Sequence, residues 1–308
     1  MYASIKMFRN TATSPLTQKK PRHMDPTEKD VVVKSWTELQ DELFRDSWNN
    51  DIQRFRSPFV YRGLSNKSYR LVTSLIRLDG AFSKLEKHLL RSFRKYGQGV
   101  SQKFHSIWHL LTIAQHYGLP TRLLDWTYSP YVALHFATAN HVRYGMDGVI
   151  WIINYQRAHD LLPDELKNCL HTEGAQAFTI ELLSVLFKGE VEKGLLPDDF
   201  SFHDVIRSLE EFDKYSRFGE FLLFFEPPSM DERIINQYAL FSVMPNSDRA
   251  IDDWLQQHPQ LYRRIIIPAE LKWEFRDKLD QCNITERVLF PGLDGLSSYL
   301  RRYYSPKD

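Results

Sequence analysis

The segment 115–137 limits the fold of this chain more than any other, because two helix-breaking residues lie among ionisable side chains. Gly118 readily closes a helix and Pro120 prevents its continuation, so the backbone must break there. The ionisable side chains around this break are those of His116, Arg122 and Asp125. Backbone breaks between packed helices are where binding and catalytic residues usually lie. We therefore expect the functional site here.

Composition favours a folded domain without a membrane partner. The chain has 308 residues, 43% of them hydrophobic, which is enough for one large domain or two small ones. Lys and Arg number 40 against 39 Asp and Glu, so net charge gives no argument for nucleic acid. No apolar run reaches the roughly 18 residues of a membrane span, and no secretory signal is recognisable. Cys169 and Cys282 lack disulfide or zinc spacing, which favours a cytoplasmic location.

Periodicity predicts mostly helices in the first half of the chain and mostly strands in the second. Helical spacing and capping residues predict helices over 35–44, 83–96, 103–117, 129–137, 172–187, 270–281 and 296–303. β-Branched and aromatic runs predict strands over 31–33, 59–62, 148–154, 221–225, 239–243, 263–267 and 287–290, with Gly63 ending the second. This order indicates the α+β class, a single domain whose central mixed or antiparallel sheet is flanked by helices.

The N-terminus and one internal stretch are expected to lie outside the regular core. Residues 1–30 are polar and basic, which is typical of a disordered tail, and nucleic-acid contact is the alternative. Residues 31–304 would form the folded domain. Within it, residues 188–218 carry the least regular pattern and are a candidate insertion.

Several motifs resemble the FRG domain, a family named for a Phe/Tyr-Arg-Gly motif near its start. They are Tyr61-Arg62-Gly63, the central run 115–137, Arg233 to Gln237 with Phe241, and Leu289 to Leu296. One departure is Tyr238-Ala239, where the family pattern leads us to expect a glycine nearby. The family is widespread in bacteria and phages and its biochemical role is poorly defined. The resemblance therefore implies an FRG-type domain over 31–304 without naming its reaction.

A weaker resemblance to ADP-ribosyltransferases suggests a reaction. Those enzymes place Arg-Gly on an early strand, then a Ser-Thr-Ser strand, a helix with Ala-x-x-Phe-Ala, and a catalytic Glu on a late strand. Arg62-Gly63, Asp125 to Thr127 and Ala133 to Ala137 keep that order, while Gln237 stands where the Glu is expected. The resemblance implies an NAD-consuming toxin, defence protein or modifier that acts on a protein or nucleic-acid acceptor. An antitoxin or regulatory protein is a candidate partner.

This resemblance implies roles for the motif residues, with NAD as co-substrate. Cleavage of the nicotinamide bond passes through an oxocarbenium-like state, so the site must hold pyrophosphate and stabilise positive charge on the ribose. Arg62 would clamp phosphate, Asp125 would stabilise the cation, and His116 would carry a proton. Gln237 is uncharged and would only position a hydroxyl or nucleophile.

Further residues complete the predicted site. Gly63 would let the backbone approach the ligand, and Tyr61 or Trp126 would stack on nicotinamide. Ligand contacts are also assigned to Gln115, Thr121, Arg122 and Thr127. His105 and His109 lie i, i+4 on one predicted helix, but no Glu lies between them as a zinc protease needs. We therefore expect no metal.

The main site residues also have purely structural interpretations. Asp125 could pair with Arg62, or with Arg122 in a buried ion pair that fixes the break. His116 could cap its helix, Trp126 could be a core aromatic, and Gln237 could be a satisfied buried amide.

Two functions compete with the enzyme. The first is a module that binds a nucleotide, nucleic acid or protein through the same pocket. The basic stretches 54–56 and 91–95 interleave with aromatic residues, as in single-strand binders, although solvated helix or turn faces are the simpler explanation. The second is a scaffold without a ligand.

Overall fold

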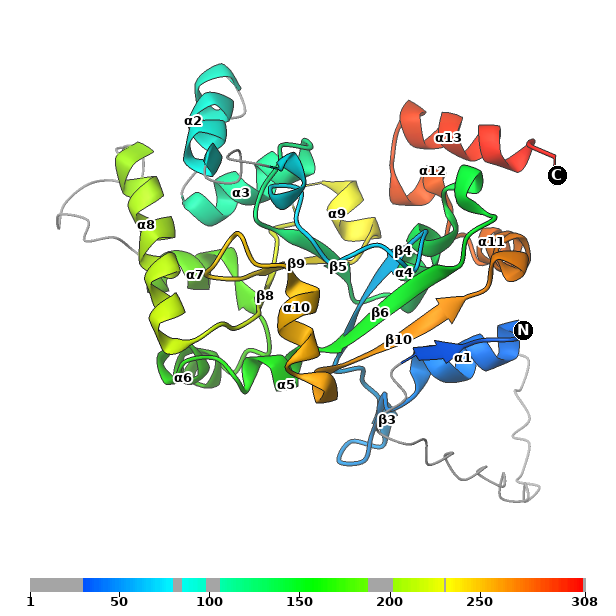
Figure 1. Ribbon diagram of the computed structural model, residues 1–308, viewed down its shortest axis with the longest axis horizontal. Helices are drawn as coiled ribbons and strands as arrows, with labels where there is room; N and C mark the ends of the chain where they lie inside the picture. Colours follow the sequence, from blue (N-terminus) through cyan, green and yellow to red (C-terminus); the bar gives the residue numbers. More distant parts are fainter. Residues whose placement is uncertain (1–29, 80–84, 98–105, 188–201, 230, 307–308) are drawn as a thin grey trace, which may run out of the picture.

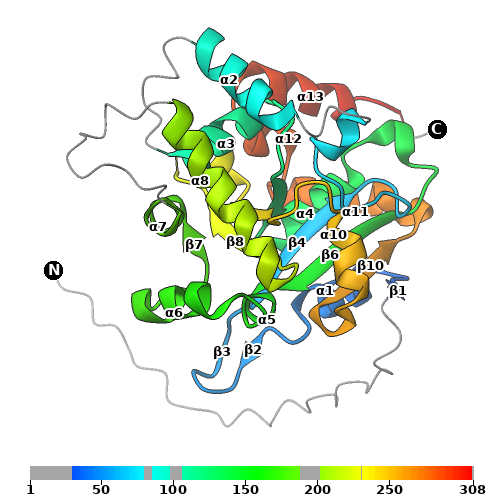
Figure 2. The ribbon, with the colours of Figure 1, turned by 60° about the vertical axis from the view of Figure 1, so that its left-hand side comes forward.

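A mixed sheet organises the fold, as the predicted α+β class requires (Figure 1). The computed structural model describes residues 30–79, 85–97, 106–187, 202–229 and 231–306. The sheet strands are β1 Asp30–Val32, β4 Phe59–Leu64, β5 Leu124–Thr127, β6 Gly148–Asn154, β7 Phe178–Thr179, β8 Leu223–Glu226, β9 Ala239–Val243 and β10 Tyr262–Ile267. Their order is β1-β10-β6-β4-β5-β9-β8-β7, parallel at the two outer pairs and antiparallel within. A separate hairpin, β2 Trp48–Asn49 and β3 Arg54–Phe55, projects from the body (Figure 2).

Helices cover both faces of this sheet. They are α1 Trp36–Phe44, α2 Glu86–Tyr96, α3 Ile107–His116, α4 Pro130–Thr138, α5 Tyr155–His159, α6 Asp164–Glu173, α7 Ile180–Leu186, α8 Phe202–Lys214, α9 Glu232–Asn236, α10 Ile251–Gln256, α11 Lys272–Gln281, α12 Glu286–Leu289 and α13 Leu293–Tyr303. Among the described residues, no helix is both long and apolar enough to cross a bilayer. Cys169 and Cys282 are both free thiols.

The central strand β6 explains how the core is divided. Its odd-numbered apolar residues pack under α5 and α10, and its even-numbered ones pack under α1, α4 and α11. Because strand side chains alternate between faces, a nearly continuous apolar run can bury both faces at once. The prediction of a central strand over 148–154 is confirmed, since β6 lies between β10 and β4.

The face that carries α4 holds a second group of helices farther along the sheet. Helices α3, α6, α7 and α8 pack there on β8 and β9, through residues such as Phe225 and Val243. The strands β4, β5 and β9 run between the two groups of helices. A cleft in the helical layer is therefore expected over these three strands.

The strands β4 and β5 separate after a single residue pair. Tyr61 pairs with Thr127, and the register goes no further, whereas β4 continues along β6 for its whole length. Directly after this pair, Gly63 lets α4 approach β4 backbone to backbone, since an added Cβ would lie 1.7 Å from the carbonyl oxygen of Ala133. The sheet is therefore open between β4 and β5, and α4 forms one side of the opening.

Three predicted elements differ from the structure. The single helix predicted over 172–187 is wrong in its first half, because Gly174 adopts a left-handed conformation that ends α6 and Phe178–Thr179 pairs with β8. Its second half is helical, as α7 Ile180–Leu186. The predicted strand 287–290 is helical, since the Thr285 hydroxyl caps α12 by accepting from the amide of Val288. The strand over 59–62 does not end at Gly63 but continues through Leu64.

Some predictions fall outside the described residues. They are the disordered tail over residues 1–29, the capping residue Ser83, the ligand candidate His105 and the 188–201 part of the candidate insertion. The remainder of that insertion forms α8 and a short turn of helix that follows it.

We predict that Gly63→Ala destabilises the protein by about 3 kcal/mol or more, because the new methyl group meets the backbone of α4, which cannot move aside cheaply. Urea denaturation measures the free energy of unfolding. Gly145→Ala is the matched control, since a Cβ at Gly145 meets no atom within 4 Å. Equal stability of the two variants would contradict this account of the α4 contact.

We also predict an acid-sensitive contribution from His159. Its Nε2 accepts the amide of Phe224 at 2.9 Å, its Nδ1 lies 3.0 Å from the carbonyl oxygen of Gln176, and burial lowers its pKa to about 4. The folded protein therefore favours the neutral imidazole. The contribution of His159 to the free energy of unfolding is fully present above the unfolded pKa near 6.5 and declines as the pH falls towards 4. Titration of this residue should lower the free energy of unfolding by about 2 kcal/mol between pH 7.5 and pH 5.

Urea midpoints at the two pH values, for wild type and His159→Gln, measure this contribution. The variant removes the titrating group, so its stability should fall less than that of wild type over the same interval. Parallel losses would show that His159 does not titrate as described.

Candidate active site

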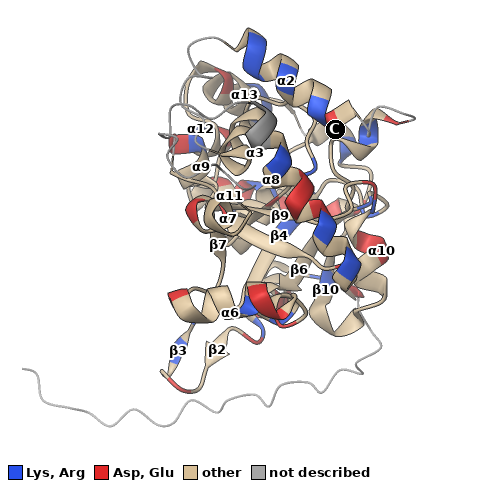
Figure 3. Cartoon of the chain, turned by 90° about the vertical axis from the view of Figure 1, so that its left-hand side faces the viewer, with Lys and Arg blue, Asp and Glu red and all other residues tan. Residues whose placement is uncertain are grey.

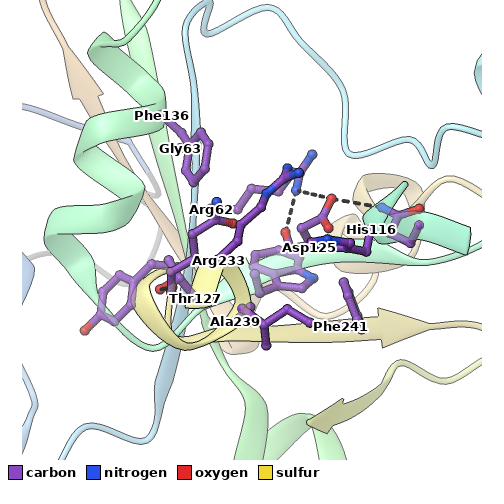
Figure 4. A pocket seen from close by; sticks show the side chains of 14 residues that line it. Arg62, Gly63, His116, Asp125, Thr127, Phe136, Arg233, Ala239 and Phe241 are labelled. Atoms are coloured by element: carbon purple, nitrogen blue, oxygen red, sulfur yellow. Dashed lines mark hydrogen bonds and ion pairs between the residues drawn. The ribbon is translucent and has the colours of Figure 1, made fainter. Parts of the chain in front are cut away.

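A pocket of about 230 Å³ occupies the opening between β4 and β5 (Figure 4). Strands β4, β5 and β9 form its floor, and α3, α4 and α9 supply its walls. The predicted site residues that line it are Tyr61, Arg62, Gly63, Gln115, His116, Asp125, Trp126, Thr127 and Gln237. Thr121 and Arg122 do not line it. The fold thus brings together residues from three separate motifs.

Arg62 fills the gap where the β4–β5 ladder stops. Its Nη1 donates to the main-chain carbonyl of Asp125 and lies 3.7 Å from the carboxylate of the same residue. Its Nε is buried and has no hydrogen-bond partner among the described residues. Burial lowers the pKa of Arg62 below its ordinary value, against the opposing effect of Asp125. An unpaired buried donor costs about 1–3 kcal/mol, which an anionic ligand would offset by accepting its hydrogen bond.

A chain of polar side chains holds Asp125 from behind. The hydroxyl of Thr121 donates to Oε1 of Gln115 at 2.6 Å, and Nε2 of Gln115 donates to Oδ2 of Asp125 at 3.0 Å. Thr121 therefore orients Gln115, which orients Asp125, although Thr121 does not reach the pocket. The Asp125 side chain remains 54% exposed, so its carboxylate is open to a ligand.

His116 lies at the last turn of α3 and joins that helix to α9. Its Nε2 is 2.7 Å from Oδ2 of Asp231, whose Oδ1 accepts the amide of Ile234 and caps α9. A histidine oriented by a carboxylate can accept a proton through its other ring nitrogen. Asp231 was not among the predicted site residues, although an Asp just before a short apolar run is a typical N-cap signal.

Gln237 is bound at both its backbone and its side chain. Its carbonyl accepts the hydroxyl of Thr127 at 2.7 Å, and its Nε2 donates to the carbonyl of Leu289 in α12 at 2.9 Å. These contacts match the structural alternative for Gln237, a satisfied amide. They also fix the end of α9 against β5 and α12.

Two aromatic residues of the predicted site belong to the core as well as to the pocket. Trp126 is buried and donates from Nε1 to the hydroxyl of Ser242 at 2.8 Å. The hydroxyl of Tyr61 donates to the carbonyl of Leu43 at 3.2 Å, and burial raises the pKa of Tyr61. Both residues line the pocket, and these bonds fix their side chains within the core.

Arg122 lies away from the pocket, and the alternative in which it pairs with Asp125 is wrong. Its Nη2 is 2.6 Å from Oε2 of Glu86 in α2, and its Nη1 contacts Asp213 in α8. Burial opposes the charge, but the two carboxylates outweigh it and raise the pKa of Arg122. The backbone break between α3 and α4 is thus anchored to α2 and α8. No local sequence pattern links the break to these two helices.

The pocket contains residues that were not assigned to the predicted site, namely Phe136, Arg233, Ile234, Ala239 and Phe241. Arg233 matters most, because it adds a second cation. It is exposed, its guanidinium lies 5.0 Å from the ring centroid of Phe290, and it extends towards the same part of the pocket as Arg62 (Figure 4). The Arg233-to-Gln237 motif contained this residue, but only its position on α9 shows that it faces the pocket.

The charges in the pocket indicate which kind of ligand it can bind. The residues that line the pocket include two cations, Arg62 and Arg233, and one carboxylate, Asp125. The pocket therefore suits a ligand that carries an anionic group and develops positive charge close to it during a reaction. In the view of Figure 3, Lys and Arg alternate with Asp and Glu along the chain, and basic bands lie on α2. Among the described residues, no group of three or more His, Cys, Asp and Glu side chains is placed to hold a metal ion.

Comparison with known proteins identifies one domain. Residues 57–144 match the FRG domain family, so the chain carries an FRG domain over this range. No curated protein and no solved structure matches the chain. The matched range includes Arg62, Gln115, His116 and Asp125, whereas Arg233 and Gln237 lie beyond it.

We predict that Arg122→Ala destabilises the protein by about 3–5 kcal/mol, because it leaves the carboxylates of Glu86 and Asp213 without their cation. Chemical denaturation measures the change. Arg91→Ala, at an exposed position of α2, is the control and should unfold like wild type. A small effect of Arg122→Ala would show that the buried carboxylates find other partners.

Proposed function

We propose that the pocket binds NAD and that the protein cleaves its nicotinamide–ribose bond, transferring ADP-ribose to a macromolecular acceptor. The observation that carries this proposal is the mostly buried guanidinium of Arg62, which lines a pocket together with Arg233 and Asp125 and whose Nε has no hydrogen-bond partner among the described residues. Two arginines suit a pyrophosphate, and a nearby carboxylate suits the positive charge that develops on the ribose.

Four side chains would take part in the reaction. Arg62 and Arg233 would bind pyrophosphate oxygens. The bond between ribose C1′ and the nicotinamide nitrogen would break, and neutral nicotinamide would leave with the electron pair. Asp125, oriented by Gln115, would stabilise the resulting oxocarbenium ion. The acceptor would attack C1′ and lose its proton to Nδ1 of His116, because Nε2 already contacts Asp231.

The apolar side of the pocket would receive the nicotinamide ring. Trp126, Phe136 and Phe241 line the pocket, and aromatic walls favour a planar ring. A volume of about 230 Å³ suits one ring with its ribose, so the adenosine half would lie outside the pocket.

A nucleotide-binding module without catalysis is the second candidate. It is favoured by Gln237, whose amide is occupied by Leu289 at the position where ADP-ribosyltransferases have their catalytic Glu. The same pocket would then hold a nucleotide through its arginines, with Asp125 serving mainly to position Arg62.

We predict that Asp125→Asn retains NAD binding but lowers nicotinamide release at least about 100-fold, because the amide keeps a hydrogen-bonding oxygen and loses the charge. Arg233→Ala should weaken NAD binding about tenfold. Binding is measured by the NAD-induced thermal shift, and turnover by nicotinamide release with cell extract as the source of acceptor.

Arg301→Ala, at an exposed position of α13, is the control and should behave as wild type in both assays. A thermal shift that depends on Arg233, without any nicotinamide release, would favour the binding module. No shift with NAD would reject the proposal.

A further inference from the structure

Tyr238 adopts a backbone conformation that tyrosine rarely takes. Its φ is +48°, in the left-handed region, and its side chain is 62% exposed. A bulky residue here strains the backbone, and glycine would not. The strained backbone at Tyr238 is not offset by burial of its side chain. This indicates that the exposed ring has a function.

The ring of Tyr238 forms part of an aromatic box. Its centroid lies 5.1 Å from that of Tyr128, with the planes inclined at 59°, and Tyr128 lies 5.8 Å from Tyr155 at 68°. Rings inclined in this way form separate walls, whereas a stack would close the space between them. All three line a groove of about 540 Å³.

A carboxylate completes the box. Glu226 also lines the groove, and its Oε1 accepts the hydroxyl of Tyr128 at 2.9 Å. Burial and the nearby Glu226 raise the pKa of Tyr128, so its hydroxyl stays protonated as the donor. The three tyrosines and the carboxylate of Glu226 therefore line one groove, and both aromatic rings and a carboxylate attract an organic cation.

We propose that this groove binds a basic side chain, arginine or lysine, of a protein partner. Aromatic faces around a carboxylate complement an organic cation, and a volume of about 540 Å³ leaves room for flanking backbone. The hairpin β2–β3, which projects from the body (Figure 2), lines the groove with Phe55 and has exposed Trp48, Ile52 and Phe55 for apolar contacts with the partner.

The charges that line the groove distinguish a basic side chain from nucleic acid as its ligand. Arg56 lines the groove and its Nη1 donates to the carbonyl of Phe55 at 2.8 Å, so a phosphate backbone would gain one contact there. Glu226, however, lines the same groove beside the hydroxyl of Tyr128, and its carboxylate would repel a phosphate there. The carboxylate of Glu226 beside Tyr128 therefore favours the cation.

This inference goes beyond the proposed NAD chemistry and does not depend on it. The two sites are nevertheless neighbours in the chain. Tyr128 directly follows Thr127, Tyr238 directly follows Gln237, and the amide of Tyr128 donates to the carbonyl of Tyr238 at 3.0 Å. A partner held in the box would lie beside the strand ends that carry the pocket.

Fluorescence anisotropy with labelled Gly-Ser peptides tests the proposal. One peptide carries a central arginine, one a lysine and one a glutamine. We expect the arginine or the lysine peptide to bind and the glutamine peptide to fail. Tyr238→Gly and Glu226→Gln should weaken binding at least tenfold, while Tyr238→Phe retains it. Tyr238→Gly should also raise the melting temperature, which separates lost binding from lost folding.

Arg56→Ala distinguishes the two occupants. Binding of the basic peptide should be unchanged or tighter without this like charge. Single-stranded oligonucleotide that binds wild type and is weakened by Arg56→Ala and Tyr238→Gly would assign the groove to nucleic acid and overturn the proposal. Failure of both basic peptides to bind at millimolar concentration, or binding that ignores Tyr238 and Glu226, would overturn it as well.

Discussion

The contact between Arg62 and the carbonyl of Asp125 is the interaction on which the site depends. The β4–β5 ladder ends after Tyr61 and Thr127, and continuing it would close the sheet. Arg62 instead donates to Asp125 across the gap, so the strands remain linked while a space opens between them. A guanidinium has five donors, and the carbonyl uses only part of this capacity. The same residue can therefore link the two strands and keep donors that the carbonyl does not use, among them Nε, which has no partner in the described part of the chain.

The pocket needs more of the chain than the matched FRG range. Its far wall comes from α9, which is held by the capping carboxylate of Asp231 and by two bonds to α12, from Asn236 to Val288 and from Gln237 to Leu289. Helix α12 is fixed in turn by Arg302 of α13, which pairs with Glu286 at 2.6 Å and with Asp280 of α11 at 2.8 Å. The C-terminal helices thus act on the pocket by positioning α9.

Local patterns in the sequence predicted the floor of the site better than its supports. The central motif and Tyr61-Arg62-Gly63 correctly named residues that meet at the pocket, because each lies within a few positions of a strand end or a helix break. The partners of Arg122 were missed, since Glu86 and Asp213 lie on other helices and no spacing rule links them. The predicted strand 287–290 failed for a related reason, because a short apolar run does not distinguish a strand from one helical turn.

The glutamine at position 237 follows from the fold. Its side chain must donate to the carbonyl of Leu289, and a glutamate there would set two acceptors against each other. A carboxylate that acts on a ligand would therefore come from a different element of the pocket than the end of α9, where Gln237 lies. Asp125 meets that requirement on the neighbouring strand β5, where Gln115 supplies the orienting donor and more than half of the side chain stays exposed. Within the proposed chemistry, the charge that ADP-ribosyltransferases place on a late strand is supplied here from the centre of the sheet.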